Sequence, residues 1–196
     1  NALGKVINSY SLVYDFSALG KVVVAPDVSG SMGGFYSGTR FGSTRNTHRP
    51  IEIAAMFAGI LCGSMKGSHL LPWDTNVYKT KDVFPGEREW RTPTKIMARI
   101  MEMGGGGTYM ELPVQHMFEQ RINADTFILI TDSEEWGAGW LFDWKVYRKK
   151  HPGARAFLIR VDLYPTRPFS GDDCAKYGIT QVYGFNDNVF KLMLRN

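Results

Sequence analysis

Residues 21–31 read KVVVAPDVSGS and decide the fold class. Lys21–Ala25 is a short apolar run rich in β-branched residues, which is typical of a strand buried on both faces. Asp27, Ser29 and Ser31 follow in a glycine-containing turn with the pattern D-x-S-x-S. A buried strand that ends in such a turn predicts a parallel sheet whose ligand site lies beyond the carboxyl ends of its strands.

The rest of the chain alternates between apolar runs and helical patterns. We expect strands at 69–73, 76–83, 126–130, 156–161 and 181–183, and helices at 51–65, 92–103, 109–122, 141–150, 172–177 and 188–195. The strand runs are mainly continuous in their apolar character, as in sheets that are covered on both faces. The pattern predicts an α/β fold, a doubly wound, mostly parallel sheet with helices on both faces, of the Rossmann-like class.

Length and composition indicate one globular domain, with 196 residues of which 44% are hydrophobic. We expect this domain to span residues 20–196, and residues 1–19 to form a terminal helix or a link from a preceding domain. No apolar run approaches the roughly 20 residues of a membrane-spanning helix. Because no signal peptide opens the chain and only two cysteines occur, we expect a cytoplasmic location. The net charge of +4 permits a nucleic-acid partner without singling one out.

Short oxygen-bearing side chains are expected to gather at one edge of this sheet. Three lie in the D-x-S-x-S turn, one follows the glycine run 104–107, and one follows the strand at 126–130. Taken singly, each is as well explained as a turn former or a helix cap. Together they suit a hard divalent cation, since Mg²⁺ prefers oxygen ligands and few carboxylates. We predict a site for Mg²⁺, or alternatively Mn²⁺ or Ca²⁺, made by Asp27, Ser29, Ser31, Thr108 and Asp132.

This set resembles the metal-ion-dependent adhesion site of von Willebrand factor A domains, whose pattern is D-x-S-x-S, then a Thr, then an Asp. The resemblance implies that both serines and the threonine hold the ion directly or through water. It also implies that the aspartates act directly or from behind those ligands, and that one position stays open for an acidic group of the ligand.

Four segments resemble, more narrowly, the A domain of the Ro (TROVE) family: DVSGSM at 27–32, GGTYMELPVQ at 106–115, FILITDSE at 127–134 and YGITQVYGFNDNVFKLM at 177–193. Proteins of that family are ring-shaped and bind small noncoding or misfolded RNA. The resemblance implies an RNA-binding ribonucleoprotein domain that acts with a helical-repeat ring outside this sequence. Two features depart from the family: Pro26 precedes the first aspartate, and the loop 33–49 is longer than usual.

The loop after the first strand holds candidate RNA contacts. Arg40, Arg45 and Arg49 alternate there with aromatic residues. Basic groups contact phosphates and aromatic rings stack on bases. A solvated loop explains the same composition equally well, so both interpretations stay open.

Three tryptophans follow the second aspartate at helical spacing: Trp136, Trp140 and Trp144. This spacing favours a packed helix face over a ligand platform. Trp136 nevertheless lies near enough to the strand end to be a candidate ligand contact.

The sequence therefore predicts a metal-binding A domain of a Ro-like protein, in which the ion docks an acidic group of RNA. The alternative is a protein-interaction module whose ion captures an Asp or Glu of a partner. A metal-dependent hydrolase is least favoured because no general base is visible at the strand ends. We expect no enzymatic activity and no membrane contact.

Overall fold

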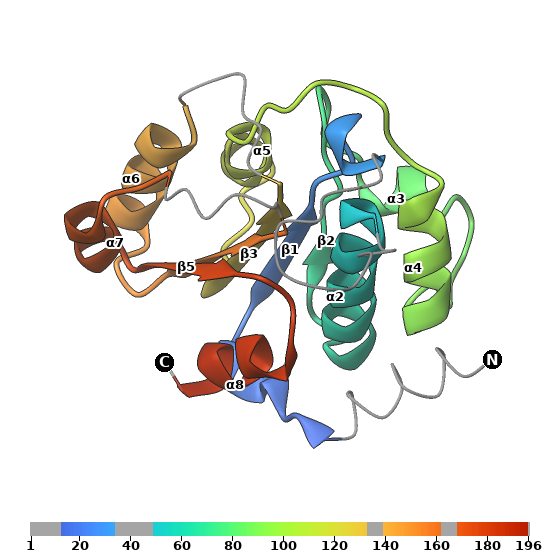
Figure 1. The fold of residues 1–196 in the computed structure, drawn as a ribbon, viewed down its shortest axis with the longest axis horizontal. Coiled ribbons are helices and arrows are strands. Elements are labelled where there is room, and N and C mark those ends of the chain that lie inside the picture. Colours follow the sequence, from blue (N-terminus) through green and yellow to red (C-terminus); the bar gives the residue numbers. More distant parts are fainter. Residues whose placement is uncertain (1–12, 34–48, 133–138, 162–167, 196) are drawn as a thin grey trace, which may run out of the picture.

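A computed structural model describes residues 13–33, 49–132, 139–161 and 168–195. At its centre lies a five-stranded sheet in the order β2–β1–β3–β4–β5, with every neighbouring pair parallel (Figure 1). The strands are β1 (Val22–Pro26), β2 (His69–Leu70), β3 (Thr126–Thr131), β4 (Arg155–Arg160) and β5 (Ile179–Tyr183). The predicted α/β class is confirmed. Since the strand order reverses between β1 and β3, the edge beyond these two strands is where ligands bind in such sheets.

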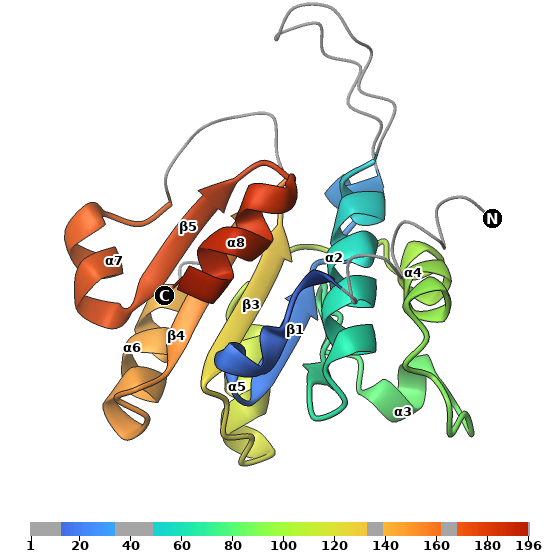
Figure 2. The ribbon, with the colours of Figure 1, turned by 90° about the horizontal axis from the view of Figure 1, so that it is seen from below.

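Helices cover both faces of the sheet (Figures 1 and 2). One face carries α2 (Pro50–Ser64), α4 (Pro93–Met101) and α8 (Asp187–Arg195), and the other carries α5 (Leu112–Glu119), α6 (Trp140–Lys150) and α7 (Gly171–Tyr177). The shorter elements are the 3₁₀ turns η1 (Phe16–Leu19) and η2 (Ser31–Gly33) and the helix α3 (Thr80–Val83). Within the described ranges, no helix is both long and apolar enough to cross a membrane.

The tryptophans of α6 pack into the core, as their spacing predicts. Trp140 and Trp144 are buried and stack on each other with ring centroids 5.7 Å apart. Trp144 also stacks on Phe127 of β3 and on Tyr147, one turn further along the helix. These aromatic contacts fix α6 against the sheet. The interpretation of a packed face is confirmed for these two tryptophans, while Trp136 lies outside the described residues.

The strand expected at 76–83 is wrong, because Thr80–Val83 is helix α3 and only Val77 pairs, through one bridge to Trp73. The chain turns back before it can extend, since the Asp74 carboxylate accepts from the Asn76 N–H at 2.9 Å. The strand expected at 69–73 is shorter, since β2 ends at Leu70. Hydrogen bonds to β1 nevertheless continue beyond it, because the N–H groups of Leu71 and Trp73 donate to the carbonyls of Val24 and Pro26 at 2.9 and 3.1 Å.

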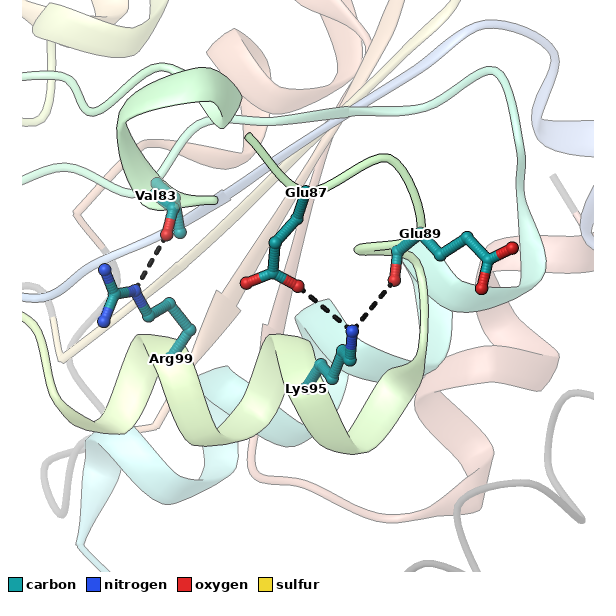
Figure 3. Close-up of polar contacts among 5 residues, drawn as sticks. All are labelled: Val83, Glu87, Glu89, Lys95 and Arg99. Carbon is teal, nitrogen blue, oxygen red and sulfur yellow. Dashed lines mark hydrogen bonds and ion pairs between the residues drawn. The ribbon is translucent and has the colours of Figure 1, made fainter. Parts of the chain in front are cut away.

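The segment between α3 and α4 is tied to α4 by side chains of that helix (Figure 3). Lys95 Nζ lies 3.1 Å from Glu87 Oε2 and 3.3 Å from the Glu89 carbonyl. Arg99 Nε donates to the Val83 carbonyl at 2.8 Å. Because α4 in turn packs along α2, these contacts attach α3 and the segment after it to the helices on this face of the sheet.

The remaining helices follow the predicted order with small shifts of their ends. Helix α5 begins at Leu112 rather than at residue 109, because residues 109–111 form a turn in which the Leu112 N–H donates to the Tyr109 carbonyl at 3.2 Å. The terminal helix or link expected over residues 1–19 lies largely outside the described residues, which begin at Val13.

Candidate metal centre

The five predicted metal ligands lie on segments that meet at the carboxyl edge of β1 and β3. Asp27 directly follows β1, and its N–H donates to the Ile130 carbonyl of β3 at 2.8 Å. Asp132 directly follows β3. Asp27 is fully buried and Asp132 is 2% exposed. The sheet register thus brings two buried carboxyl groups to the same edge, at the switch in strand order.

The D-x-S-x-S turn brings its two hydroxyl groups together. The Ser29 N–H donates to Asp27 Oδ1 at 2.8 Å, which closes the turn directly after the strand. Ser31 begins the 3₁₀ turn η2. The hydroxyl oxygens of Ser29 and Ser31 lie 3.2 Å apart. Two convergent hydroxyls beside a carboxylate are a donor set that a hard cation can use.

The glycine run is clamped onto this turn by backbone hydrogen bonds. The Gly30 N–H donates to the Gly106 carbonyl at 2.8 Å, and the Gly105 N–H donates to the Val28 carbonyl at 3.2 Å. Gly104 has φ +109°, and a Cβ there would collide with the Val28 carbonyl. Glycine is therefore required for this close approach. The clamp positions the segment that carries Thr108, which is itself 2% exposed.

Asp74 positions the glycine run, a role that the sequence reasoning missed. It is 2% exposed, and its Oδ2 accepts from the Gly106 N–H at 3.3 Å and from the Tyr78 hydroxyl at 3.0 Å. Its backbone carbonyl accepts from the Tyr109 N–H at 3.4 Å, on the far side of Thr108. The sequence does carry a signal for Asp74, because this acid directly follows the apolar run 69–73, just as Asp27 and Asp132 follow theirs.

Asp27 is held in an environment that disfavours its charge. The pKa of Asp27 is raised to about 7, with burial as the main cause; the nearby negative charge of Asp132 acts in the same direction, while hydrogen bonds from Thr131 and Ser29 oppose the rise. Thr131 Oγ1 donates to Asp27 Oδ2 at 2.6 Å, which is shorter than the hydrogen bond from the Ser29 N–H. The sequence places the Thr131 hydroxyl at the end of the same strand as Asp132, but Thr131 is not among the five predicted ligands, and its hydrogen bond to Asp27 is a finding of the structure.

The residues at this edge fit a divalent cation. A cation next to two buried carboxylates would offset the desolvation that now acts on Asp27. Within the described ranges no cluster of three or more His, Cys, Asp or Glu residues forms a metal site. The edge instead offers two carboxylates and three hydroxyls, which is the composition that the sequence predicts for Mg²⁺.

The candidate RNA contacts are only partly described. Arg49 lies at the start of α2, where its Nε is 2.9 Å from Glu52 Oε1. Arg40, Arg45 and Trp136 lie outside the described residues. The prediction that these four side chains contact a ligand stays a prediction.

The chain is similar to proteins of known family and known fold. A family model described as the Ro60 vWA domain matches residues 21–195. The fold resembles that of the Deinococcus radiodurans Ro (RSR) protein, with a TM-score of 0.62 and 18% identity over 91% of this chain and 34% of that one. It also resembles proximal thread matrix protein 1 of the mussel byssus, with a TM-score of 0.54 and 17% identity over 89% of this chain and 46% of that one.

A von Willebrand factor type A protein from Catenulispora acidiphila shares the fold as well, with a TM-score of 0.52 and 13% identity over 89% of this chain and 41% of that one. The chain thus spans between a third and a half of the length of these three structures. No curated protein sequence matches it.

Proposed function

This chain belongs to the Ro60 vWA domain family, and from that premise we propose that it docks RNA through a divalent cation. The ion in this proposal is Mg²⁺, or alternatively Mn²⁺ or Ca²⁺. When bound, it supplies a Lewis-acidic position that accepts a phosphate oxygen. The residues that would hold it are Asp27, Ser29, Ser31, Thr108 and Asp132.

The observation that carries the proposal is the pairing of a fully buried Asp27 with two hydroxyls 3.2 Å apart. Thr131 orients the Asp27 carboxylate by its 2.6 Å hydrogen bond, and the Ser29 N–H holds the other oxygen. The backbone clamp at Gly30 and Gly106 fixes the threonine segment relative to the serines. An arrangement set by the backbone before the ion arrives lowers the cost of binding it.

Binding without turnover is part of the proposal. The residues at this edge are ligands and hydrogen-bond partners, and we assign none of them as a general base. The Deinococcus Ro protein is about three times as long as this chain, since the chain covers 34% of it. We therefore propose that the domain acts within a cytoplasmic ribonucleoprotein, together with a helical-repeat ring that provides further RNA contacts.

The test is RNA binding with the ion present and with it removed. Fluorescence anisotropy of a labelled hairpin RNA with a single-stranded 3′ end is recorded in Mg²⁺ and in EDTA. We expect binding that weakens at least tenfold in EDTA and in a Ser29→Ala/Ser31→Ala variant, because both changes remove the docking position. Thr94→Ala, which removes an exposed hydroxyl from α4, is the matched control and should bind like the wild type.

RNA binding that is equal in Mg²⁺ and EDTA would contradict the proposal. Mg²⁺-dependent binding of a carboxylate-bearing peptide, with no RNA binding, would favour the alternative in which the ion captures an Asp or Glu of a protein partner.

A further inference from the structure

An open groove lies between α6 and α7, on the side of these helices that faces away from the sheet. The two helices lie side by side (Figures 1 and 2) and are joined by an ion pair between Lys145 Nζ and Asp173 Oδ1 at 2.9 Å. The groove has a volume of about 520 Å³. It shares no residue with the candidate metal centre, so an inference about it does not depend on the proposed function.

The floor of the groove is apolar. Phe142 is 69% exposed, and Val146, one helical turn further along α6, is 36% exposed. Pro152 extends this surface beyond the helix end. Trp140, Trp144 and Tyr147 take up the buried face of α6, so Phe142 and Val146 are on its outer side and add nothing to the core. Exposed apolar side chains that gather in one place, with polar groups around them, are typical of surfaces on which a partner packs.

The rim of the groove is positively charged. Four cationic side chains line it: Lys145, Arg148, Lys149 and Lys176. Asp173 pairs with Lys145, and Asp143 accepts from Gln115 Nε2 at 2.8 Å. None of the described residues that line the groove is acidic. A concave apolar floor inside a cationic rim is complementary to an occupant with apolar side chains flanked by carboxylates.

We propose that this groove binds an acidic amphipathic helix of a protein partner. Phe142 and Val146 are spaced i, i+4, which matches the spacing of side chains along one face of a second helix. The features favour a peptide over RNA. Val146 has no π face, and the ring of Tyr177 already has the ammonium groups of Lys145 and Lys176 over it, at 4.8 and 5.4 Å from its centroid. Base stacking, which dominates single-strand binding, is thereby limited to Phe142.

The probe for this proposal is a synthetic helical peptide of about 18 residues, long enough to hold helical structure, with Leu at i, i+4 and i+7 and Glu around them. Its binding is followed by fluorescence anisotropy in EDTA, so that the metal centre plays no part. Two counterparts accompany it: a peptide with Lys in place of every Glu, and a single-stranded oligouridylate.

We expect the acidic peptide to bind the wild type and the lysine peptide not to bind. Phe142→Ser should weaken binding about tenfold, because it removes the exposed apolar anchor. Lys149→Glu/Lys176→Glu should weaken peptide binding about as much. Because salt screens charges, this loss of affinity should be larger at low salt than at high salt. Lys66→Glu/Lys81→Glu makes the same charge change at exposed positions outside the groove and should bind like the wild type.

Three results would overturn the proposal. The first is no binding of the acidic peptide, and the second is binding that is equal in all variants, which would place it elsewhere on the domain. The third is binding of the oligouridylate that is lost in Phe142→Ser while the acidic peptide does not bind, which would make the groove an RNA site.

Discussion

The metal edge and the α6–α7 groove are two binding surfaces built in opposite ways. At the edge, the side chains are oxygen-bearing and, apart from the partly exposed Ser31, buried; Asp27 has no exposed surface. They come from separate loops that backbone hydrogen bonds hold together. In the groove the side chains are cationic or apolar and partly or largely exposed, with Phe142 69% exposed, and, apart from Pro152, they lie on two helices.

Because of this difference, ligand binding and folding stability are coupled at the edge but not in the groove. A change at the edge alters buried polar contacts, so it affects both the ligand and the free energy of unfolding. A change on the outer side of α6 affects the ligand alone, because Phe142 and Lys149 contribute nothing to the core. A substitution at one surface should therefore leave ligand binding at the other surface unchanged.

Apart from the loss of Asp27 itself, Asp132→Asn should have the largest effect on Mg²⁺ affinity, and that effect should be confined to the edge. Removing a negative charge from the cation site lowers Mg²⁺ affinity by about 10- to 100-fold, while acidic-peptide binding in the groove stays unchanged. Isothermal titration calorimetry measures the first and anisotropy the second. Asp82→Asn, at an exposed position on α3, is the matched control. A parallel loss of peptide binding would show that the two surfaces are coupled.

The edge should respond to pH. Since burial raises the pKa of Asp27 to about 7 from its ordinary value of 3.8, the proton binds the folded chain more tightly than the unfolded one. In EDTA, the stability from protonated Asp27 is complete below about pH 4 and falls by roughly 1.4 kcal/mol per pH unit up to about pH 7. Mg²⁺ needs the ionised form, so its affinity should rise about tenfold per unit over the same range and then level off.

Urea unfolding in EDTA at several pH values tests this slope. Asp27→Asn cannot ionise, and its stability relative to the wild type should therefore improve as the pH rises from 5 to 7. A constant difference between the two proteins over that range would mean that Asp27 does not have a raised pKa.

Thr131→Val should shift the pH response without removing the site. The hydroxyl donates to the ionised Asp27 carboxylate at 2.6 Å, so its loss raises the pKa of Asp27 further. A hydrogen bond to a charged group contributes about 1.5–3 kcal/mol, and we expect Mg²⁺ affinity at pH 6 to fall about tenfold or more. At pH 9 most of the affinity should return. A loss that is the same at both pH values would assign Thr131 a packing role only.

Asp74→Asn should have the smallest effect at the edge. The amide keeps the size of the side chain but removes one of the acceptors that serve Gly106, Asn76 and Tyr78. We expect a several-fold loss of Mg²⁺ affinity and a decrease in stability of about 1 kcal/mol. Tyr78→Phe removes one of the same hydrogen bonds but leaves the Asp74 carboxylate and its hydrogen bond from Gly106 in place. If Tyr78→Phe lowers Mg²⁺ affinity as much as Asp74→Asn does, Asp74 acts through overall stability and not through the glycine run.

Much of the fold and the edge could be predicted because their signals are local. Continuous apolar runs identify the central strands, and the residues that follow each strand must share one edge in a parallel sheet. Asp27 and Asp132 could therefore be assigned to one edge from sequence. Thr131 and Asp74 obey the same rule, but their roles could not be predicted, because these roles lie in hydrogen bonds to the ligand-bearing segments.

The rest could not be predicted because it depends on contacts between distant segments. The bend after Trp73 arises from the Asp74 carboxylate, which turns an expected strand at 76–83 into a loop and helix α3. The groove likewise needs Tyr177 and Lys176 of α7 beside Phe142 of α6. No spacing along the chain signals that arrangement.

Calorimetric titration of Mg²⁺ into the wild type and Asp27→Asn at pH 8 tests the central claim most directly. We expect one ion per chain in the wild type and no measurable binding in the variant, whose thermal unfolding in EDTA should show that it is folded. Binding of Mg²⁺ to a folded Asp27→Asn chain with wild-type affinity would contradict the assignment of this edge as the metal centre.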